Sequence, residues 1–399
     1  MNILFDLSAT QPVTGNDFHG GSEYAKTVFF RLCDEIPTVL EVFYNPLKKI
    51  DTSILEICKN KGFVINFCRN NSEISALLCR KKFDVFYSAL PYLFTSLTIP
   101  PETRFIYTVH GLRPLEFFAD KYDIKYKKIH LKSLIKHILF LFFPALFRKY
   151  KIRKSTGDFN RLFSLTNNQT IITVSDHSKY AIAYFFPLIN TSGIKVFYSP
   201  LKQFEINDND NTETLGSFSL KHEKYILLTG GDRNEKGAYR ACRVLYNLIK
   251  NDKGLPEDIK VIILGVSNHK AYRKLTNNND RFEFRGYVST GELETLYKNA
   301  RLFLYPTLNE GFGYPPLEAM KYGILCACSA NSAITEIYGN SVLYFNPFDE
   351  TEMGIRILQS FDENIRREKS EIIKTRYKLI RERQEQDLDS LVQTIIQRM

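Results

Sequence analysis

Two glutamates, Glu310 and Glu318, stand eight residues apart in the stretch NEGFGYPPLEA, with two glycines after the first and two prolines before the second. Gly311 and Gly313 would let backbone N–H groups approach a ligand closely. The prolines suit the first turn of a helix, and a helix N-terminus favours an anion. An anion with hydroxyls beside it fits this arrangement, and a nucleotide-sugar has both.

A second stretch, ILLTGGDRNEKGAYRA, places Arg233 and Lys236 after two glycines and before an amphipathic helical pattern. Two cations that follow a strand and precede a helix N-terminus suit a diphosphate. The alternative is a pair of exposed charges in a turn. Each stretch follows an expected strand, and ligands of open parallel sheets bind beyond the carboxyl ends of the strands.

Short runs rich in β-branched and aromatic residues alternate with helical patterns along the chain, which is typical of parallel sheets wrapped by helices. The runs before residue 200 are NILFDL, TVLEVFY, FVINF, DVFYSA, RFIYTVH, TIITVS and KVFYSP. The runs after residue 220 are KYILLTG, KVIILG, FEFRGYV, LFLYP, ILCACS and SVLYF. We therefore expect an α/β protein made of two Rossmann-like domains that face each other across a cleft.

The expected boundaries follow the change in composition between the two series. They are an N-terminal domain at 1–205, a linker at 206–220, a C-terminal domain at 221–375, and a helix at 376–399 that returns toward the N-terminal domain. The linker is polar and acidic, and its Asp208 and Asp210 resemble a metal motif only superficially because no strand precedes them. We expect no metal and no cofactor. The Gly-x-Gly-x-x-Gly fingerprint of dinucleotide-binding enzymes follows none of the expected strands.

A basic insert at 118–155 interrupts the N-terminal domain. Residues 121–154 hold eleven Lys and Arg and one acid, so they carry a charge equal to the net +10 of the whole chain. Lys125, Lys128, Lys132 and Lys136 recur at helical spacing, with apolar residues on the opposite face. This pattern predicts a helix that lies on an anionic membrane surface. The alternative is a helix packed on the N-terminal domain.

Other features set the compartment and exclude a class of partner. The first residues have no basic leader, and no run approaches the ~20 apolar residues of a membrane span. The seven scattered cysteines favour buried thiols in a reducing compartment. The positive charge is interleaved with long apolar runs, so we expect no nucleic acid partner. We therefore expect a cytoplasmic protein at the inner face of the cell membrane.

The spacing from Glu310 to Glu318 with the intervening GFGYPPL resembles the E-x7-E signature of retaining glycosyltransferases with the GT-B fold, the family-four group. The resemblance extends over nearly the whole chain. It implies that Glu310 orients the donor sugar, that Glu318 holds the ribose, and that Phe312 lies in the donor loop. It also implies that Arg233 and Lys236 neutralise the departing diphosphate.

Further positions match the family pattern in the expected order. The resemblance places Gly20 and Gly21, in FHGGSEYAK, against the donor phosphates or the acceptor. It places His110, at the end of a strand, near the donor sugar, and Ser175 matches a recurrent serine at a strand end. The backbone at Tyr287 and Val288 is expected to hold the nucleobase.

The sequence thus predicts a retaining glycosyltransferase that moves a sugar, with mannose as the candidate, from a nucleoside-diphosphate donor. The expected acceptor is a lipid-linked or membrane-proximal glycan in O-antigen, lipopolysaccharide core or capsule assembly. One alternative is a sugar-nucleotide epimerase of the same fold. Another is a catalytically silent partner subunit that binds a nucleotide-sugar. The sequence does not indicate an oligomeric state.

Overall fold

The computed structural model describes all residues except 13–19, 37–39, 95, 118–119, 123–134, 136–137, 139–141, 201–219 and 398–399. The chain divides into two compact units. Unit 1 comprises 1–115, 151–203 and 381–399, and unit 2 comprises 116–150 and 204–380. The linker carboxylates Asp208 and Asp210 and the four lysines of the predicted membrane face lie outside the described residues.

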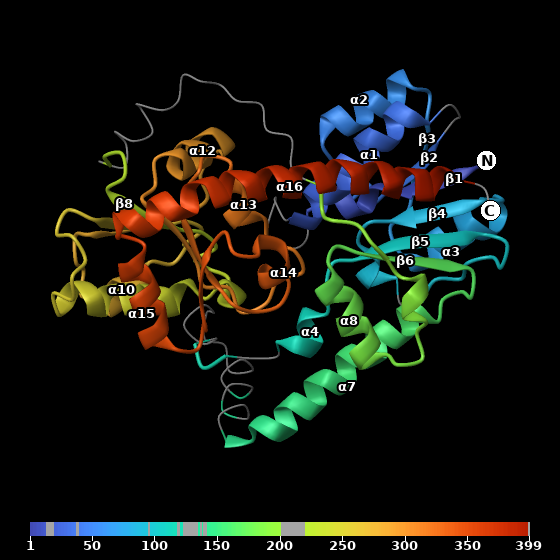
Figure 1. The fold of residues 1–399 in the computed structure, drawn as a ribbon. Helices are drawn as coiled ribbons and strands as arrows, with labels where there is room; N and C mark the ends of the chain where they lie inside the picture. The colour runs from blue at the N-terminus through green and yellow to red at the C-terminus, as the bar shows by residue number, and fades with distance from the viewer. Residues whose placement is uncertain are drawn as a thin grey trace. The chain divides into compact units, whose positions relative to one another are not determined.

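Unit 1 is built on a seven-stranded parallel sheet with the order β3-β2-β1-β4-β5-β6-β7. The strands are β1 (Ile3–Asp6), β2 (Glu41–Tyr44), β3 (Val64–Phe67), β4 (Val85–Ser88), β5 (Arg104–Val109), β6 (Gln169–Thr173) and β7 (Lys195–Val196). The helices are α1 (Gly20–Glu35), α2 (Thr52–Asn60), α3 (Asn71–Arg80), α4 (Arg113–Glu116), α8 (Asp176–Phe185) and the part of α7 (Pro144–Phe163) from residue 151 onward. Helices cover both faces of this sheet (Figure 1), so its strands read as nearly continuous apolar runs.

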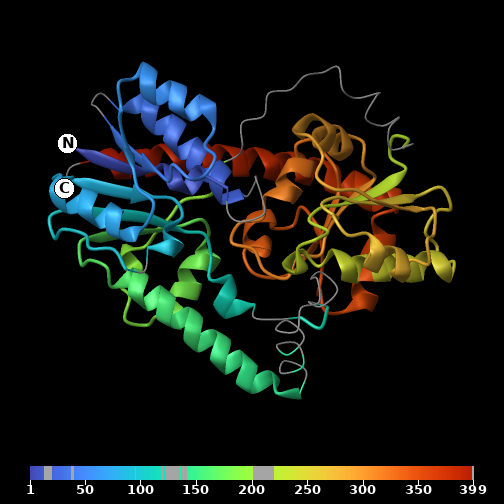
Figure 2. The same cartoon turned by 180° about the vertical axis from the view of Figure 1, so that it is seen from behind.

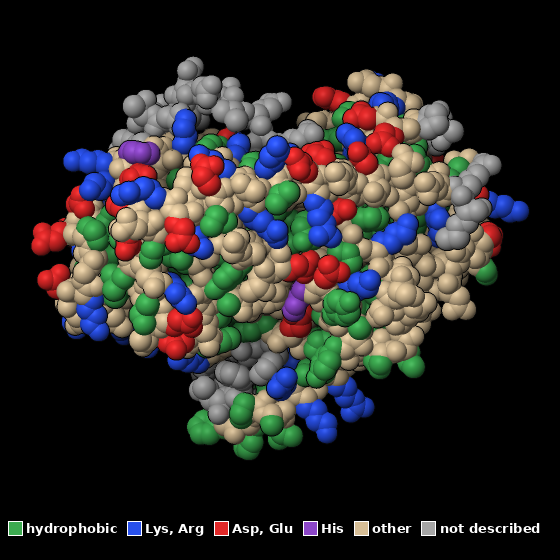
Figure 3. All heavy atoms as spheres, viewed as in Figure 1, with side chains coloured by type: hydrophobic (Ala, Val, Ile, Leu, Met, Phe, Trp, Pro, Cys, Tyr) green, Lys and Arg blue, Asp and Glu red, His purple; other side chains and the backbone are tan. Residues whose placement is uncertain are grey.

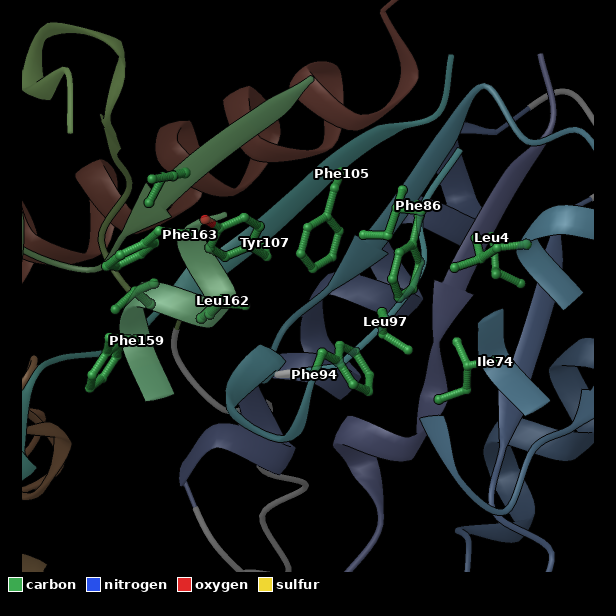
Figure 4. Close-up of a cluster of buried hydrophobic side chains, with 14 of the residues drawn as sticks. Leu4, Ile74, Phe86, Phe94, Leu97, Phe105, Tyr107, Phe159, Leu162 and Phe163 are labelled. Atoms are coloured by element: carbon green, nitrogen blue, oxygen red, sulfur yellow. The ribbon is translucent and has the colours of Figure 1, made fainter. Parts of the chain in front are cut away.

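The core of unit 1 is aromatic. The ring of Phe105 on β5 stacks between Phe86 of β4 and Tyr107 of its own strand, with centroids 4.9 and 4.5 Å apart. Figure 4 shows these rings beside Phe159 and Phe163, which come from the last turn and a half of α7. The end of α7 is therefore part of the core, whereas Leu146 and Tyr150 in its first half are exposed.

Unit 2 repeats the design with a six-stranded sheet of order β10-β9-β8-β11-β12-β13. The strands are β8 (Tyr225–Leu228), β9 (Lys260–Ile263), β10 (Phe282–Phe284), β11 (Leu302–Tyr305), β12 (Cys326–Ser329) and β13 (Leu343–Phe345). The helices are α10 (Ala238–Lys250), α11 (Lys270–Leu275), α12 (Thr290–Lys298), α13 (Tyr314–Met320), α14 (Ile334–Tyr338), α15 (Glu350–Gln359) and α16 (Glu363–Ile396). Neighbouring strands of this sheet are parallel, as they are in unit 1. The predicted fold class is confirmed.

The final helix α16 contributes to both units. In unit 2 the guanidinium of Arg376 donates to the carbonyl oxygen of Ile337 at 2.7 Å. In unit 1 the side-chain amide of Gln384 donates to the carbonyl of Ser199, and the Asp387 carboxylate accepts from the Tyr198 N–H. The residues from 381 onward are grouped with unit 1 for this reason.

The basic insert is divided in a way that differs from the expected boundaries. The sequence predicts that 118–155 belong to the N-terminal domain, whereas the structure groups 116–150 with unit 2. The physical reason lies at the start of the insert, where Asp120 forms an ion pair with Arg240 of α10. Within the described residues, no helix is both long and apolar enough to cross a membrane.

The carboxyl group of Asp6, at the end of β1, is fully buried. We therefore expect the stability of the protein to depend on pH. Burial raises its pKa to about 6, although hydrogen bonds from Ser8 and Ser88 oppose the shift. The ordinary value is 3.8. Between these values the folded state binds more protons than the unfolded state, so this group's contribution to stability falls as the pH rises.

We expect Asp6→Asn to remove this decrease in stability with rising pH, because an amide does not titrate. The free energy of unfolding of wild type relative to Asp6→Asn should decrease by roughly 2 kcal/mol between pH 4 and pH 7. Urea unfolding of both proteins at the two pH values measures it. A difference that is the same at both pH values would show that the buried carboxyl does not change its proton affinity on folding.

Candidate active site

Three loops of unit 2 meet at the carboxyl edge of its sheet, because strands β8, β11 and β12 are neighbours. The loop after β8 contains Arg233 and Lys236, and the loop after β11 contains Glu310. The two loops are tied by backbone: the N–H of Leu308 donates to the carbonyl of Glu235 at 2.7 Å. The predicted carboxylate and cations are therefore brought together.

Glycines allow the loops to approach this closely. Gly237 has φ +68°, and a Cβ built on it would lie 2.0 Å from the carbonyl oxygen of Pro306. Gly313 has φ +92°, and a Cβ there would lie 2.5 Å from the Cδ1 of Ile334. Only glycine fits both positions, on conformational and steric grounds.

The carboxylate of Glu310 is the centre of a buried hydrogen-bond network. Its Oε1 accepts from Lys236 Nζ at 2.5 Å, from Tyr305 Oη at 2.6 Å and from Thr307 Oγ1 at 2.8 Å. Lys236 also donates to Tyr305 Oη at 2.8 Å. Glu310 is 7% exposed and Lys236 8% exposed. Glu310 is therefore packed inside the site as well as hydrogen-bonded there.

The protonation states of the neighbouring groups follow from their surroundings. Burial, and then the charge of Glu310, hold the pKa of Tyr305 well above its usual value, so this phenol stays protonated and donates. Burial acts to lower the pKa of Arg233, but attraction to Glu235 and then to Glu310 outweighs it, and the pKa is raised. Arg233 therefore remains a cation, held by Glu235 at 2.7 Å.

The second glutamate stands on α13, as predicted, and is half-buried. Tyr297 Oη donates to Glu318 Oε2 at 3.0 Å. Burial, and then Glu318, hold the pKa of Tyr297 well above its usual value. The start of α13 is fixed by Tyr338, whose hydroxyl donates to the carbonyl of Gly313 and accepts from the Leu317 N–H.

The remaining predicted donor residues of unit 2 lie in nearby loops. Phe312 is buried beside Gly311 and Gly313 in the loop after β11. Tyr287 and Val288 follow β10, and the Tyr287 side chain is 71% exposed.

Four predicted residues belong to unit 1. Gly20 and Gly21 begin α1. Ser175 caps α8, where its hydroxyl accepts from the Ser178 N–H. His110 follows β5, and its Nε2 lies 2.9 Å from the carbonyl oxygen of Ala89, so this nitrogen carries a proton. His110 and Ser175 thus lie at the carboxyl edge of the first sheet, and each has a structural hydrogen bond.

Sequence reasoning missed three members of the Glu310 network. Tyr305 and Thr307 flank Pro306 at the end of β11, and no sequence pattern distinguishes them from ordinary residues at a strand end. Ser332 accepts from the Glu310 N–H at 2.8 Å. Its φ of +46° lies in the left-handed region, which is uncommon for a residue with a side chain and often accompanies functional sites.

No group of three or more His, Cys, Asp or Glu side chains is placed to hold a metal ion within the described part of the chain. The charged side chains that pair in the loops after β8 and β11 are those of Arg233 with Glu235 and of Lys236 with Glu310.

Residues 212–376 match the family Glycosyl transferases group 1. This stretch, which holds most of unit 2, is a region of that family. The match covers the loops described above, so the predicted family resemblance and the predicted enzyme class are confirmed at the level of the family.

Two relatives of this chain carry names from one process. The "O-antigen chain mannosyltransferase B" of Escherichia coli is 37% identical over 222 residues, which are 51% of this chain and 55% of that protein. The "O-antigen chain mannosyltransferase RfbU" of Salmonella typhimurium is 26% identical over 309 residues, 71% of this chain and 80% of that protein. The chain thus spans little more than half the length of the first relative.

Solved structures show the same fold over the full chain. HepE of Anabaena, in complex with UDP and glucose, has a TM-score of 0.64 and 14% identity over 99% of this chain and 98% of that one. WaaG, a glycosyltransferase involved in lipopolysaccharide biosynthesis, has a TM-score of 0.58 and 14% identity over 99% of each chain. At such identity the likeness establishes the GT-B fold alone.

The buried Lys236–Glu310 ion pair predicts a strong dependence of stability on both partners. Removing one partner leaves an uncompensated buried charge, which typically costs about 3–5 kcal/mol. We expect Glu310→Ala and Lys236→Met each to lower the free energy of unfolding by about this amount. The double variant should lose less than the sum of the two, as measured by urea unfolding.

Glu235→Gln is the matched control, since its partner Arg233 is a more exposed cation in the same loop. We expect it to cost about 1 kcal/mol or less. Additive losses in the double variant would mean that Lys236 and Glu310 do not interact.

Proposed function

We propose that this chain is a retaining glycosyltransferase that moves a sugar, of mannose type, from a nucleoside-diphosphate donor to a glycan. The acceptor is lipid-linked or membrane-proximal, in O-antigen, lipopolysaccharide core or capsule assembly. The observation that carries the proposal is the buried contact of Glu310 with Lys236 beside Arg233, in loops that fall inside the family match. The names of the two relatives support the choice of mannose and of O-antigen.

Different residues bind the diphosphate, the ribose and the base of the donor. Arg233 and Lys236 face the diphosphate, where negative charge grows as the glycosidic bond breaks. Glu318 holds the ribose, and the backbone at Tyr287 and Val288 holds the base. Two fixed cations supply the charge that a metal ion supplies elsewhere, so the proposal includes no metal.

The pairing of each cation with a carboxylate makes donor recognition depend on the sugar. Before the donor binds, Glu310 accepts from Lys236 and Glu235 accepts from Arg233, so the loops are close to neutral. Sugar hydroxyls that donate to Glu310 compete with Lys236 for its oxygen. The ammonium group is then attracted to the diphosphate. A complete donor is therefore bound better than its separate parts.

In the transfer step, the bond from the anomeric carbon to the diphosphate oxygen breaks with its electrons on that oxygen. The acceptor hydroxyl forms its bond to the same carbon from the same face. Its proton passes to the departing phosphate oxygen. The chain's own groups orient the sugar and stabilise the charge, and no side chain forms a covalent intermediate.

The test is a screen with UDP-, GDP- and dTDP-sugars, first by thermal shift and then by product analysis with a lipid-linked glycan acceptor. We expect one donor class to raise the melting temperature and to yield a glycosylated acceptor with the anomeric configuration of the donor retained. An isomerised donor would identify an epimerase. Binding without any reaction would identify a catalytically silent partner.

Glu310→Gln should separate binding from transfer. The variant removes a negative charge that competes for Lys236, so its affinity for the nucleoside diphosphate alone should rise, by roughly tenfold or about 1.4 kcal/mol. Transfer should be lost, because the sugar is no longer oriented. Calorimetric titration and a transfer assay measure the two effects.

Arg233→Ala is the matched comparison because it removes a cation from the same loops. Its nucleotide affinity should fall, and its turnover should fall on the order of 10²-fold. If Glu310→Gln transferred sugar at the wild-type rate, or if both variants changed nucleotide affinity in the same direction, the assigned roles would be wrong.

The peripheral membrane location is a second part of the proposal. Four large side chains are more than half exposed here: Phe142 and Phe143 just before α7, and Leu146 and Tyr150 in its first two turns. Hydrophobic and basic side chains lie together over this helix on the face that Figure 3 shows. Arg148 and Lys149 belong to the same surface, and Lys125, Lys128, Lys132 and Lys136 precede it. An anionic lipid surface complements both the charge and the apolar side chains.

Two double variants test this surface. Arg148→Glu/Lys149→Glu should weaken binding to anionic liposomes, since each basic residue near such a surface contributes roughly 1 kcal/mol. Phe142→Ser/Leu146→Ser should weaken it in high salt as well, because the apolar contribution is not screened. Co-sedimentation measures both, and nucleotide binding should persist in each variant. Wild-type protein that does not bind anionic liposomes would exclude the membrane contact.

A further inference from the structure

The first residues of the basic insert are anchored on helix α10 of unit 2. Asp120 and Arg240 form an ion pair at 2.7 Å in which both side chains are at least 93% buried. The hydroxyl of Tyr122 donates to Glu350 Oε1 at 3.2 Å, and Glu350 also accepts from Arg243 at 2.6 Å. We call this contact, formed by these five residues, the clasp. Figures 1 and 2 show the stretch 120–122 beside α10 and α15 in both views.

The buried position of the Arg240 guanidinium depends on the other residues of the clasp. It stacks on the ring of Tyr122 at 4.8 Å and on that of Phe348 at 5.2 Å. Its Nε has no hydrogen-bond partner in the described structure, and Asp120 is the carboxylate with which it is paired there. A buried guanidinium is costly unless it is paired, so Asp120 determines whether Arg240 can stay in this position.

Two routes connect the clasp to the loop that holds Arg233 and Lys236. Arg240 lies in the first turn of α10, where its N–H donates to the carbonyl of Gly237, the residue that follows Lys236. The other route is aromatic and runs from Tyr122 to Tyr239 to Tyr272, with ring centroids 5.4 and 5.5 Å apart.

The aromatic route ends on the loop itself. The Tyr272 hydroxyl donates to the carbonyl of Gly231 at 2.5 Å. A Cβ built on Gly231 would lie 2.2 Å from Val266, so this part of the loop is tightly enclosed and has little freedom to adjust. A shift of α10 or of Tyr272 would therefore move Arg233 and Lys236.

We infer that Asp120 and Tyr122 are positioning residues, which hold the loop of Arg233 and Lys236 in its working geometry from the start of the basic insert. The inference rests on the proposed function for the role of that loop in transfer. Without the clasp, the two cations are displaced relative to the charge that develops on the leaving diphosphate. Displacements of about 1 Å at such groups reduce turnover strongly.

The test uses Asp120→Asn, which keeps a hydrogen-bond acceptor without charge, and Asp120→Ala, which removes both. The control is Asp258→Ala, because Asp258 pairs with Lys224 at 2.7 Å on the surface of the same unit, and both side chains are about half exposed. Transfer is measured well below the melting temperature of each protein. Amide hydrogen exchange is measured for peptides that cover 230–237.

We expect turnover to fall in the order wild type, Asp120→Asn, Asp120→Ala, with a total loss of about tenfold and a donor KM that stays within about threefold. Exchange in 230–237 should be faster in Asp120→Ala and unchanged in Asp258→Ala. A lower melting temperature with wild-type turnover and wild-type exchange in this loop would show that the clasp only stabilises the fold.

The two proposals fail in different ways. If wild-type protein transfers no sugar, the proposed function is wrong, and hydrogen exchange alone decides whether the clasp positions the loop. If Asp120→Ala does not fold, turnover and hydrogen exchange are measured on Asp120→Asn and Tyr122→Phe instead. Tyr122→Phe removes only the hydroxyl that contacts Glu350, so its smaller effect on exchange should lie in the same direction.

Discussion

The buried ion pair between Lys236 and Glu310 is the contact on which the candidate site depends. It joins the loops after β8 and β11, and the N–H of Glu310 extends the network to Ser332 in the loop after β12. Ions removed from water are costly, and the pair is tolerable because Tyr305 and Thr307 satisfy the same carboxylate oxygen. Removing any member leaves the others buried and poorly paired.

This constraint explains where the glycines must be. The ammonium group reaches Glu310 only if the loop after β8 passes close to Pro306, and Gly237 makes that passage possible. Gly313 likewise allows α13 to begin directly behind the carboxylate, so that Glu318 lies on the same edge of the sheet. The clasp adds a constraint from outside the loops, because Asp120 holds Arg240 on the helix that follows Lys236.

Much of this arrangement could be predicted from the sequence because it depends on residue type and periodicity. Every expected strand is present, and the prolines begin α13 as predicted. Tyr305 and Ser332 could not be predicted, since a buried tyrosine or a loop serine has no local signature of its partner. The contact from Asp120 to Arg240 joins residues 120 positions apart, and only the fold brings them together.

The most direct test of the central claim is a crystal structure of the protein with an intact, non-hydrolysable nucleoside-diphosphate sugar. The account predicts that sugar hydroxyls donate to Glu310, and that diphosphate oxygens lie within hydrogen-bond distance of Arg233 and Lys236. Lys236 should then be shared between Glu310 and the diphosphate. A donor bound away from these three residues, with the Lys236–Glu310 pair unchanged, would contradict the account.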